Sequence, residues 1–256
     1  MTYDDIAVAL IVGNWKMNTT VNSAIMLANA VKFQIEDQFR HEVVVCPPYV
    51  SLHSVSETLR GSNIAVGAQN MHSETNGAVT GEISAEMLSQ ICQYVIVGHS
   101  ERRTYFSETD LFINSKLLAA LSADITPILC VGENLEDRDS GLAHDMVSSQ
   151  LEANLNGMDL DSKIVIAYEP VWAIGTGQSA SPEIAQDMMF HIREILADLV
   201  GNRSEAIPLL YGGSVNEDNI GVYVSQADID GALVGGTSLN ADAFCRLVAN
   251  ASRTER

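Results

Sequence analysis

Four residues of this sequence carry side chains that could together perform acid–base chemistry. Asn14, Lys16, His99 and Glu169 each stand just after an apolar run of strand length. A carboxylate can act as a general base, a neutral imidazole can donate a hydrogen bond to a carbonyl oxygen, and an ammonium group can offset the charge of an oxyanion. Each of them alone could also be an ordinary loop residue, so the elements that position them must decide between the two interpretations.

The surroundings of Glu169 favour a base beneath a movable loop. Residues 164–167 form an apolar, β-branched run, Glu169 stands where that strand should end, and Pro170 cannot continue a strand ladder. A bulky apolar segment then leads to residues 175–177, whose two glycines leave the backbone free to change direction. Proton transfer shielded from water requires a base of this kind and a hinged apolar flap. The alternative is an exposed acid on an ordinary loop.

His99 stands both at the end of a predicted strand and at the start of a predicted helix. Ser100, which follows it, is a residue type that caps helix N-termini, and we expect Ser100 to be the N-cap here. The positive end of a helix disfavours the protonated form of a nearby histidine. His99 would then be a neutral hydrogen-bond donor, although a histidine that only caps a turn would give the same pattern.

Two glycine-rich turns, residues 212–214 and 235–238, indicate a site for a phosphate group. Glycines let backbone N–H groups close around phosphate oxygens, and a following helix N-terminus adds partial positive charge. Lys16, one of only four lysines, would complete the anion site. The alternative is two ordinary turns between strand and helix.

Apolar runs of strand length alternate with helical patterns along the chain, which predicts a parallel sheet covered on both faces. Apolar residues three and four apart predict a helix over 21–35, Ser181 before Pro182 predicts a helix start, and Asn240 is expected to cap the last helix. The eight runs are residues 6–12, 43–46, 64–68, 94–97, 128–131, 164–167, 208–211 and 232–234.

The expected architecture is a single (β/α)8 barrel domain over residues 1–256. No linker-like stretch divides the chain, and its 256 residues match the roughly 250 of such barrels. An open doubly wound sheet is the structural alternative. A GxGxxG motif after the first strand would favour that fold, but the sequence there is Gly13 followed by Asn and Trp, which does not match the motif. In a barrel the carboxyl ends of the strands meet at one face, which would bring Lys16, His99 and Glu169 together.

The charge of the chain argues against several classes of partner. With 33 acidic and 14 basic residues the formal net charge is −19, which disfavours nucleic acid and anionic membranes. No apolar run approaches the roughly 20 residues of a membrane span, and the acidic start is unlike a secretory signal. The four cysteines show neither CxxC nor metal-ligand spacing, so we expect reduced thiols in the cytoplasm and no bound metal. Adaptation to salt is one hypothesis for the acidic surface, and simple solubilisation is the other.

Five segments, spread in order over essentially the whole chain, share a specific pattern. They are NWKMN at 14–18, GHSERR at 98–103, YEPVWAIGTG at 168–177, YGGSV at 211–215 and GALVGG at 231–236. Together they resemble the triosephosphate isomerase family.

The resemblance implies an enzyme that interconverts dihydroxyacetone phosphate and D-glyceraldehyde 3-phosphate in glycolysis and gluconeogenesis, without a cofactor. It implies that Glu169 is the general base, His99 the electrophile, and Lys16 and Asn14 the substrate contacts near the carbonyl oxygen. The phosphate-binding amides implied by the resemblance belong to Gly175, Ser214, Gly235 and Gly236.

The resemblance also implies a homodimer. The loop 69–82 would enter the partner near its active site, with Thr80 reaching across. Three positions depart from the usual family pattern. Val79, at a position that is usually aromatic, is a smaller apolar contact, and Thr237 stands where alanine is common. Gln178 replaces a usual lysine after the lid, which is the apolar flap that follows Glu169.

Other functions remain as alternatives at this point. A Schiff-base aldolase needs a reactive lysine at the carboxyl end of a strand, but Lys163 precedes the sixth strand and Glu169 ends it. A metal-dependent epimerase needs a His/Asp/Glu ligand set at several strand ends, which the sequence does not suggest. A catalytically inactive barrel used for binding or structure is the alternative from a different class, and the presence of Lys16, His99 and Glu169 argues against it.

Overall fold

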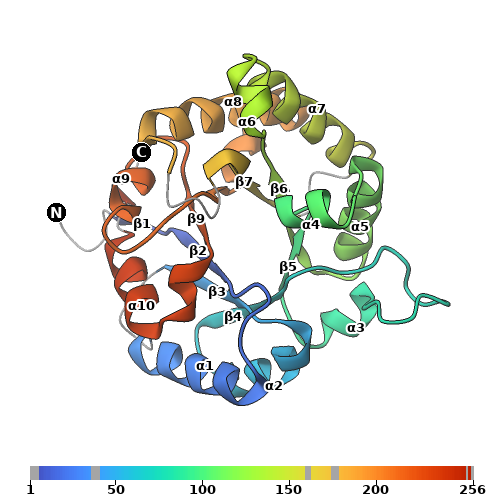
Figure 1. Ribbon diagram of the computed structural model, residues 1–256, viewed down its shortest axis with the longest axis vertical. Helices are drawn as coiled ribbons and strands as arrows, with labels where there is room; N and C mark the ends of the chain where they lie inside the picture. The colour runs from blue at the N-terminus through green and yellow to red at the C-terminus, as the bar shows by residue number, and fades with distance from the viewer. Residues whose placement is uncertain (1–5, 36–40, 159–162, 174–178, 252, 255–256) are drawn as a thin grey trace.

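A closed ring of parallel strands forms the centre of this computed structural model, and helices surround it (Figure 1). The structure describes residues 6–35, 41–158, 163–173, 179–251 and 253–254. The ring confirms the predicted (β/α)8 barrel. Its strands are β2 (Leu10–Asn14), β3 (Glu42–Cys46), β4 (Ile64–Ala68), β5 (Tyr94–Val97), β6 (Thr126–Val131), β7 (Val165–Tyr168), β8 (Leu209–Tyr211) and β9 (Gly231–Val234).

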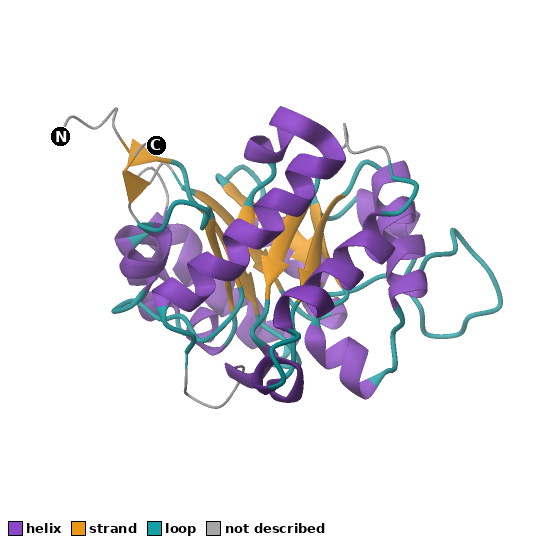
Figure 2. Ribbon diagram, turned by 90° about the horizontal axis from the view of Figure 1, so that it is seen from above, coloured by secondary structure: helices purple, strands orange, loops and turns teal. Residues whose placement is uncertain are grey.

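Helices connect the strands and cover the outside of the ring (Figure 2). None of those in the described ranges is long and apolar enough to cross a membrane. The α-helices are α1 (Val21–Ile35), α2 (Tyr49–Leu59), α3 (Ala85–Ser89), α4 (Ser100–Tyr105), α5 (Asp110–Ser122), α6 (Leu135–Asp139), α7 (Ala143–Leu155), α8 (Pro182–Val200), α9 (Ile220–Val224) and α10 (Ala241–Asn250). The 3-10 helices in the described part of the chain are η1 (Val171–Ala173), η2 (Gly201–Ala206) and η3 (Gly236–Leu239).

Two predicted helix starts are confirmed by their capping hydrogen bonds. The hydroxyl of Ser181 accepts the N–H of Ile184 at 3.3 Å at the start of α8. The side chain of Asn240 accepts the N–H of Ala243 at 3.0 Å at the start of α10. Each cap satisfies a backbone donor that the first turn of a helix leaves without an intrahelical partner.

Strand β2 closes the barrel because it pairs on both of its edges. Leu10 lies opposite Glu42 of β3 on one side and opposite Gly231 of β9 on the other. Side chains along β2 alternate between two cores: Leu10 and Val12 point into the barrel, and Ile11 packs in the layer between strands and helices. Because both faces of the strands are buried, their sequences read as continuous apolar runs.

The predicted first strand, residues 6–12, is wrong in one respect, because the run contains two strands. Ile6–Ala7 forms β1, which pairs antiparallel with β10 (Arg253–Thr254), and only the second part belongs to the barrel. Between them Val8 is exposed, and the N–H of Ala9 donates to Nδ1 of His41. Hydropathy does not reveal the break, since the apolar run continues through it and the partner of β1 lies near the other end of the sequence.

The loop after β4 projects from the barrel (Figures 1 and 2). Its base is held where the N–H of His72 donates to the carbonyl of Ile83 at 2.8 Å. Beyond that base, residues 74–82 are all exposed, including Val79 and Thr80. This projection contains most of the loop 69–82 that the sequence singled out.

Candidate functional site

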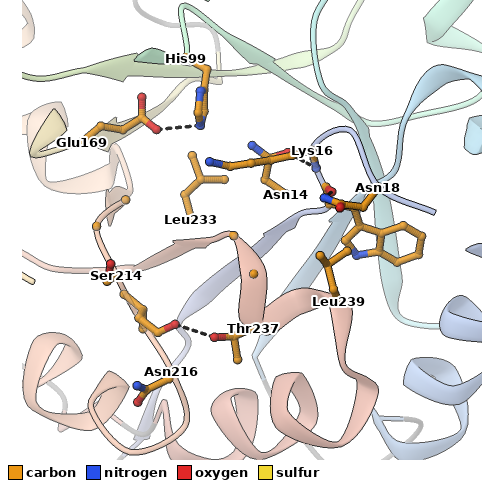
Figure 3. Close-up of a pocket in the computed structure, with 16 residues that line it drawn as sticks. Asn14, Lys16, Asn18, His99, Glu169, Ser214, Asn216, Leu233, Thr237 and Leu239 are labelled. Atoms are coloured by element: carbon orange, nitrogen blue, oxygen red, sulfur yellow. Dashed lines mark hydrogen bonds and ion pairs between the residues drawn. The ribbon is translucent and has the colours of Figure 1, made fainter. Parts of the chain in front are cut away.

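A cavity of about 390 Å³ opens at the carboxyl ends of the barrel strands. The described part of the predicted site lines it, and Figure 3 shows these side chains pointing toward one space. Gly175 and Gln178 lie outside the described residues. The predicted residues that line the cavity are Asn14, Lys16, His99, Glu169, Ser214, Gly235 and Gly236.

The barrel topology explains why residues far apart in sequence meet here. Asn14 is the last residue of β2, His99 is the second residue after β5, and Glu169 directly follows β7. Ser214 and Gly235 come just after β8 and β9. All these strands are parallel members of one closed sheet, so their carboxyl ends point to the same face.

Glu169 is almost fully buried, with 2% of its surface exposed, and both of its oxygens have partners. Oε1 lies 2.9 Å from Nε2 of His99, and Oε2 accepts the backbone N–H of Ser100 at 2.8 Å. Burial alone raises the pKa of this carboxyl, but the interaction with His99 and the Ser100 hydrogen bond outweigh it and lower the pKa. The carboxylate form is therefore the one that this arrangement stabilises.

His99 itself is the N-cap of α4, which corrects the expectation that Ser100 would be. Its Nδ1 accepts the N–H of Glu101 at 3.2 Å, and Ser100 is already the first helical residue. The imidazole can act as the N-cap because its ring nitrogen reaches the second N–H of the helix, as a serine oxygen would. An accepting Nδ1 carries no proton, so the proton lies on Nε2, which faces Glu169.

Two influences oppose each other at His99. Burial lowers the pKa of the imidazole, whereas the adjacent Glu169 carboxylate raises it, and the second prevails while the two side chains are in contact. Separation of Glu169 from His99 would remove the main influence that raises this pKa. Burial and the nearby Lys16 would then favour the neutral ring, opposed only by the weaker influence of Glu101.

Lys16, two residues after the end of β2, is held in an uncommon backbone conformation. Its φ is +52°, and its N–H donates to Oδ1 of Asn14 at 3.0 Å. Nζ lies 2.6 Å from Oε1 of Glu101, and Gln69 donates to the Lys16 carbonyl at 2.9 Å. A non-glycine residue in the left-handed region persists only where its surroundings fix it, and such residues concentrate at functional sites.

The turn after β8 requires its two glycines. A Cβ on Gly212 would lie 2.9 Å from Cγ of Glu169 and 3.0 Å from the carbonyl oxygen of Tyr168. A Cβ on Gly213 would lie 2.3 Å from the hydroxyl oxygen of Tyr211. The absence of side chains thus lets this turn pass directly beside Glu169.

A buried carboxylate that the sequence analysis did not identify, Glu133, lies beside the start of the loop that follows Glu169. Oε1 of Glu133, a residue with no exposed surface, accepts hydrogen bonds from Tyr168, Trp172 and Arg138 at 3.0, 2.8 and 2.8 Å. On the far side of residues 174–178, the N–H of Ala180 donates to the Tyr211 hydroxyl at 3.1 Å. Both described flanks of this loop are therefore fixed to the barrel.

Some further cavity residues were not assigned a role from the sequence, although they lie in or beside segments that were. Asn18 belongs to the segment that contains Lys16, and Asn216 comes two residues after Ser214. Proximity to those motifs was the only signal for them. The cavity residues not assigned a role in advance are Trp15, Asn18, Val215, Asn216 and Leu239.

The rest of the described chain offers no competing centre. Lys163 is exposed and precedes β7, at the end of the barrel opposite to Glu169. Within the described ranges no three His, Cys, Asp or Glu side chains are grouped so that they could hold a metal ion.

Comparison with known proteins agrees with this geometry. The family model of triosephosphate isomerase matches residues 9–251. The chain belongs to the triosephosphate isomerase family. A triosephosphate isomerase of Roseiflexus sp. (strain RS-1) is 51% identical over 243 residues, which cover 93% of this chain and 96% of the relative. One of Dehalococcoides mccartyi (strain CBDB1) is 48% identical over 244 residues, 95% of this chain and 96% of the relative. As a member of the triosephosphate isomerase family the chain is an isomerase.

Proposed function

We propose that this chain catalyses the reversible isomerisation of dihydroxyacetone phosphate and D-glyceraldehyde 3-phosphate, in glycolysis and gluconeogenesis. The observation that carries the proposal is the convergence on one cavity of a buried carboxylate, an imidazole N–H, an ammonium group and two glycine turns, in a member of the triosephosphate isomerase family. No cofactor is needed, because a base and a hydrogen-bond donor suffice for proton transfer beside a carbonyl.

In this proposal Glu169 removes the proton from the carbon next to the carbonyl group. The electron pair of that C–H bond forms the C–C double bond of an enediolate, and the carbonyl oxygen takes up the negative charge. His99 donates a hydrogen bond from Nε2 to that oxygen, while Asn14 and Lys16 stabilise its charge. Glu169 then returns the proton to the neighbouring carbon, and the hydroxyl proton moves between the two oxygens.

The phosphate group is assigned to the two glycine turns. Backbone N–H groups of Ser214, Gly235 and Gly236 are the proposed donors, and Gly175 would add one from the lid. Backbone amides suit this task because the chain has a formal charge of −19, which repels an anion at long range. Lys16 supplies the positive charge locally, because it lines the same cavity as Gly235 and Gly236.

We propose further that the enzyme is a homodimer that acts in the cytoplasm. The segments that follow β2, β3, β4 and β5, which are neighbouring strands of the barrel, expose large apolar side chains: Met17 after β2, Val50 in α2, Val79 in the projecting loop and Tyr105 in α4. Exposed apolar side chains of this kind are typical of an interface, and loop 69–82 with Thr80 would reach toward the partner's cavity. The cysteines Cys46, Cys92, Cys130 and Cys245 are all free and buried, which suits a reducing compartment.

A coupled assay with the purified chain tests the proposed activity. Both triose phosphates should be converted at unchanged rates in the presence of EDTA. The Glu169→Gln chain, purified in the same way, reveals any contaminating isomerase from the expression host. Equal activity in the two preparations would reject the proposal and favour a barrel that only binds its ligand. A requirement for added metal would reject it in favour of a metal-dependent enzyme.

A further inference from the structure

Thr237 joins the two glycine turns of the cavity. It lies in η3, two residues after Gly235, and it is half-buried at the cavity wall. Its hydroxyl donates a hydrogen bond to the carbonyl of Val215 at 2.9 Å, which Figure 3 shows as a dashed line. Among the described residues, this is the one hydrogen bond between the segments 212–216 and 235–239.

Each turn is braced separately by bonds within itself. The carbonyl of Gly235 accepts the N–H and the hydroxyl of Ser238 at 2.9 and 2.6 Å. The carbonyl of Ser214 accepts the side-chain amide of Asn219 at 3.2 Å. These bonds fix the shape of each turn, but they do not fix the distance between the two turns.

The strand ladder does not fix that distance either. Its last paired residues between β8 and β9 are Tyr211 and Ala232, so both turns extend beyond the hydrogen-bonded part of the sheet. The hydroxyl of Thr237 therefore bridges the turns where the ladder has ended.

The distance between the turns matters for a ligand that both turns hold. Donors on two loops can reach the oxygens of one phosphate group together only if the distance between the loops is correct. If that distance is already fixed before the ligand binds, less free energy is lost in ordering the loops. The proton of the Thr237 hydroxyl is already donated to Val215. The oxygen lone pairs that remain can only accept, so the Thr237 hydroxyl is not a direct donor to phosphate in this arrangement.

We infer that Thr237 is a positioning residue that sets the spacing of the phosphate-binding turns through its bond to the Val215 carbonyl. This inference rests on the proposed function only in assigning the phosphate group to these turns. It predicts an effect on the binding of the phosphate group and no effect on the proton transfer at Glu169.

Inorganic phosphate is the probe for the test, because it binds the turns without requiring catalysis. Its affinity is measured by isothermal titration calorimetry for the wild type, Thr237→Val and Thr237→Ser. Valine keeps the branched shape without the hydroxyl, and serine keeps the hydroxyl. We expect Thr237→Val to weaken phosphate binding by roughly two- to tenfold, the effect of one net hydrogen bond, and Thr237→Ser to bind like the wild type. Wild-type affinity in Thr237→Val, or equal loss in both variants, would overturn the inference.

Steady-state kinetics with the triose phosphates provide the second readout. KM should rise in Thr237→Val with kcat nearly unchanged, and Thr237→Ser should restore KM. A fall in kcat at constant KM would overturn the positioning role. If the wild type binds phosphate but does not isomerise triose phosphates, the proposed function fails while the calorimetric comparison still decides the role of Thr237.

Discussion

Nε2 of His99 lies 2.9 Å from Oε1 of Glu169, so the proposed electrophile and the proposed base are hydrogen-bonded to each other. Oε2 of the same carboxylate is held by the N–H of Ser100 at 2.8 Å. In the proposed reaction both His99 and Glu169 must face the substrate. Binding of the substrate must therefore separate this pair, and Glu169 must exchange its protein partners for the substrate carbon.

Replacement of Glu169 by glutamine should remove most of the activity and leave the fold. The glutamine oxygen can still accept the Ser100 N–H, but the amide cannot take a proton. We expect kcat to fall by at least roughly 10²- to 10⁴-fold, the contribution of a positioned general base. Initial rates in the coupled assay measure this effect, and thermal melting checks the fold. Glu152→Gln, at an exposed position on α7, is the matched control. Near wild-type kcat in Glu169→Gln would show that Glu169 is not the base.

The lowered pKa of Glu169 predicts how stability depends on pH. A carboxyl group whose pKa is lower in the folded chain than in the unfolded chain stabilises the fold above its unfolded pKa, about 4.5 for glutamate. That contribution is lost as the pH falls through the folded pKa. Urea unfolding should therefore show the wild type losing its advantage over Glu169→Gln as the pH drops below 4.5.

A carbon-13 NMR titration of labelled glutamate tests the cause of this shift. Without His99 the main lowering influence is gone and burial remains, so the pKa of Glu169 should rise in His99→Gln relative to the wild type. An unchanged titration midpoint would show that His99 does not stabilise the carboxylate.

Gly212→Ala should disturb catalysis through Glu169. The new methyl group would lie 2.9 Å from Cγ of Glu169, closer than real carbon contacts allow, and 3.0 Å from the Tyr168 carbonyl oxygen, which is also tight. Since displacement of a catalytic group by about 1 Å costs on the order of 10² in rate, we expect kcat to fall by roughly that factor. Gly221→Ala in α9 is the control, because its nearest neighbour beyond the helix is 3.5 Å away. Unchanged kcat in Gly212→Ala would contradict the tight fit.

The proposed dimer can be tested at Val79, which is 39% exposed on the projecting loop. Val79→Asp would bury a charge in the interface and should shift the protein to monomers, with lower activity per chain. Sedimentation velocity measures the change of mass. Phe190→Asp, at an exposed site on the outer face of α8, should leave the association state unaltered. A wild type that sediments as a monomer would reject the dimer.

The acidic surface predicts a response to salt. The formal charge of −19 makes the folded chain repel itself, and salt screens this repulsion, with a Debye length of about 3 Å at 1 M. If the surface is adapted to salt, Tm should rise as KCl is increased to molar concentration. A nonionic osmolyte at equal osmolarity is the control, and a Tm that stays constant or falls in KCl would count against adaptation to salt.

The barrel and the positions of its site residues were predictable because both depend on local sequence. Each barrel strand is an apolar run, and His99 and Glu169 mark the points where two of these runs stop. Parallel strands in one closed sheet must end at the same face, so the topology alone brings these residues together.

Orientation within the site was not predictable, because it depends on tertiary contacts. The pairing of Lys16 with Glu101 joins the loop after β2 to the first turn of α4, and no local pattern signals it. Whether His99 or Ser100 is the N-cap depends on the residue at which the helical backbone conformation begins after β5. Both residue types can cap a helix, so the local sequence does not decide between them. Glu133, the buried acceptor for Trp172, is likewise an acid that only the folded surroundings distinguish from a surface residue.

The pairing of β2 with β9 has a consequence for synthesis on the ribosome. β2 is made well before the strand that completes its second edge, Gly231–Val234, because the two strands lie far apart in the sequence. At about 5–20 residues per second, the interval between them lasts on the order of ten to forty seconds. During this time the nascent chain presents an unpaired apolar strand that can associate with other chains. We expect this interval to be the stage at which the growing polypeptide depends most on chaperones.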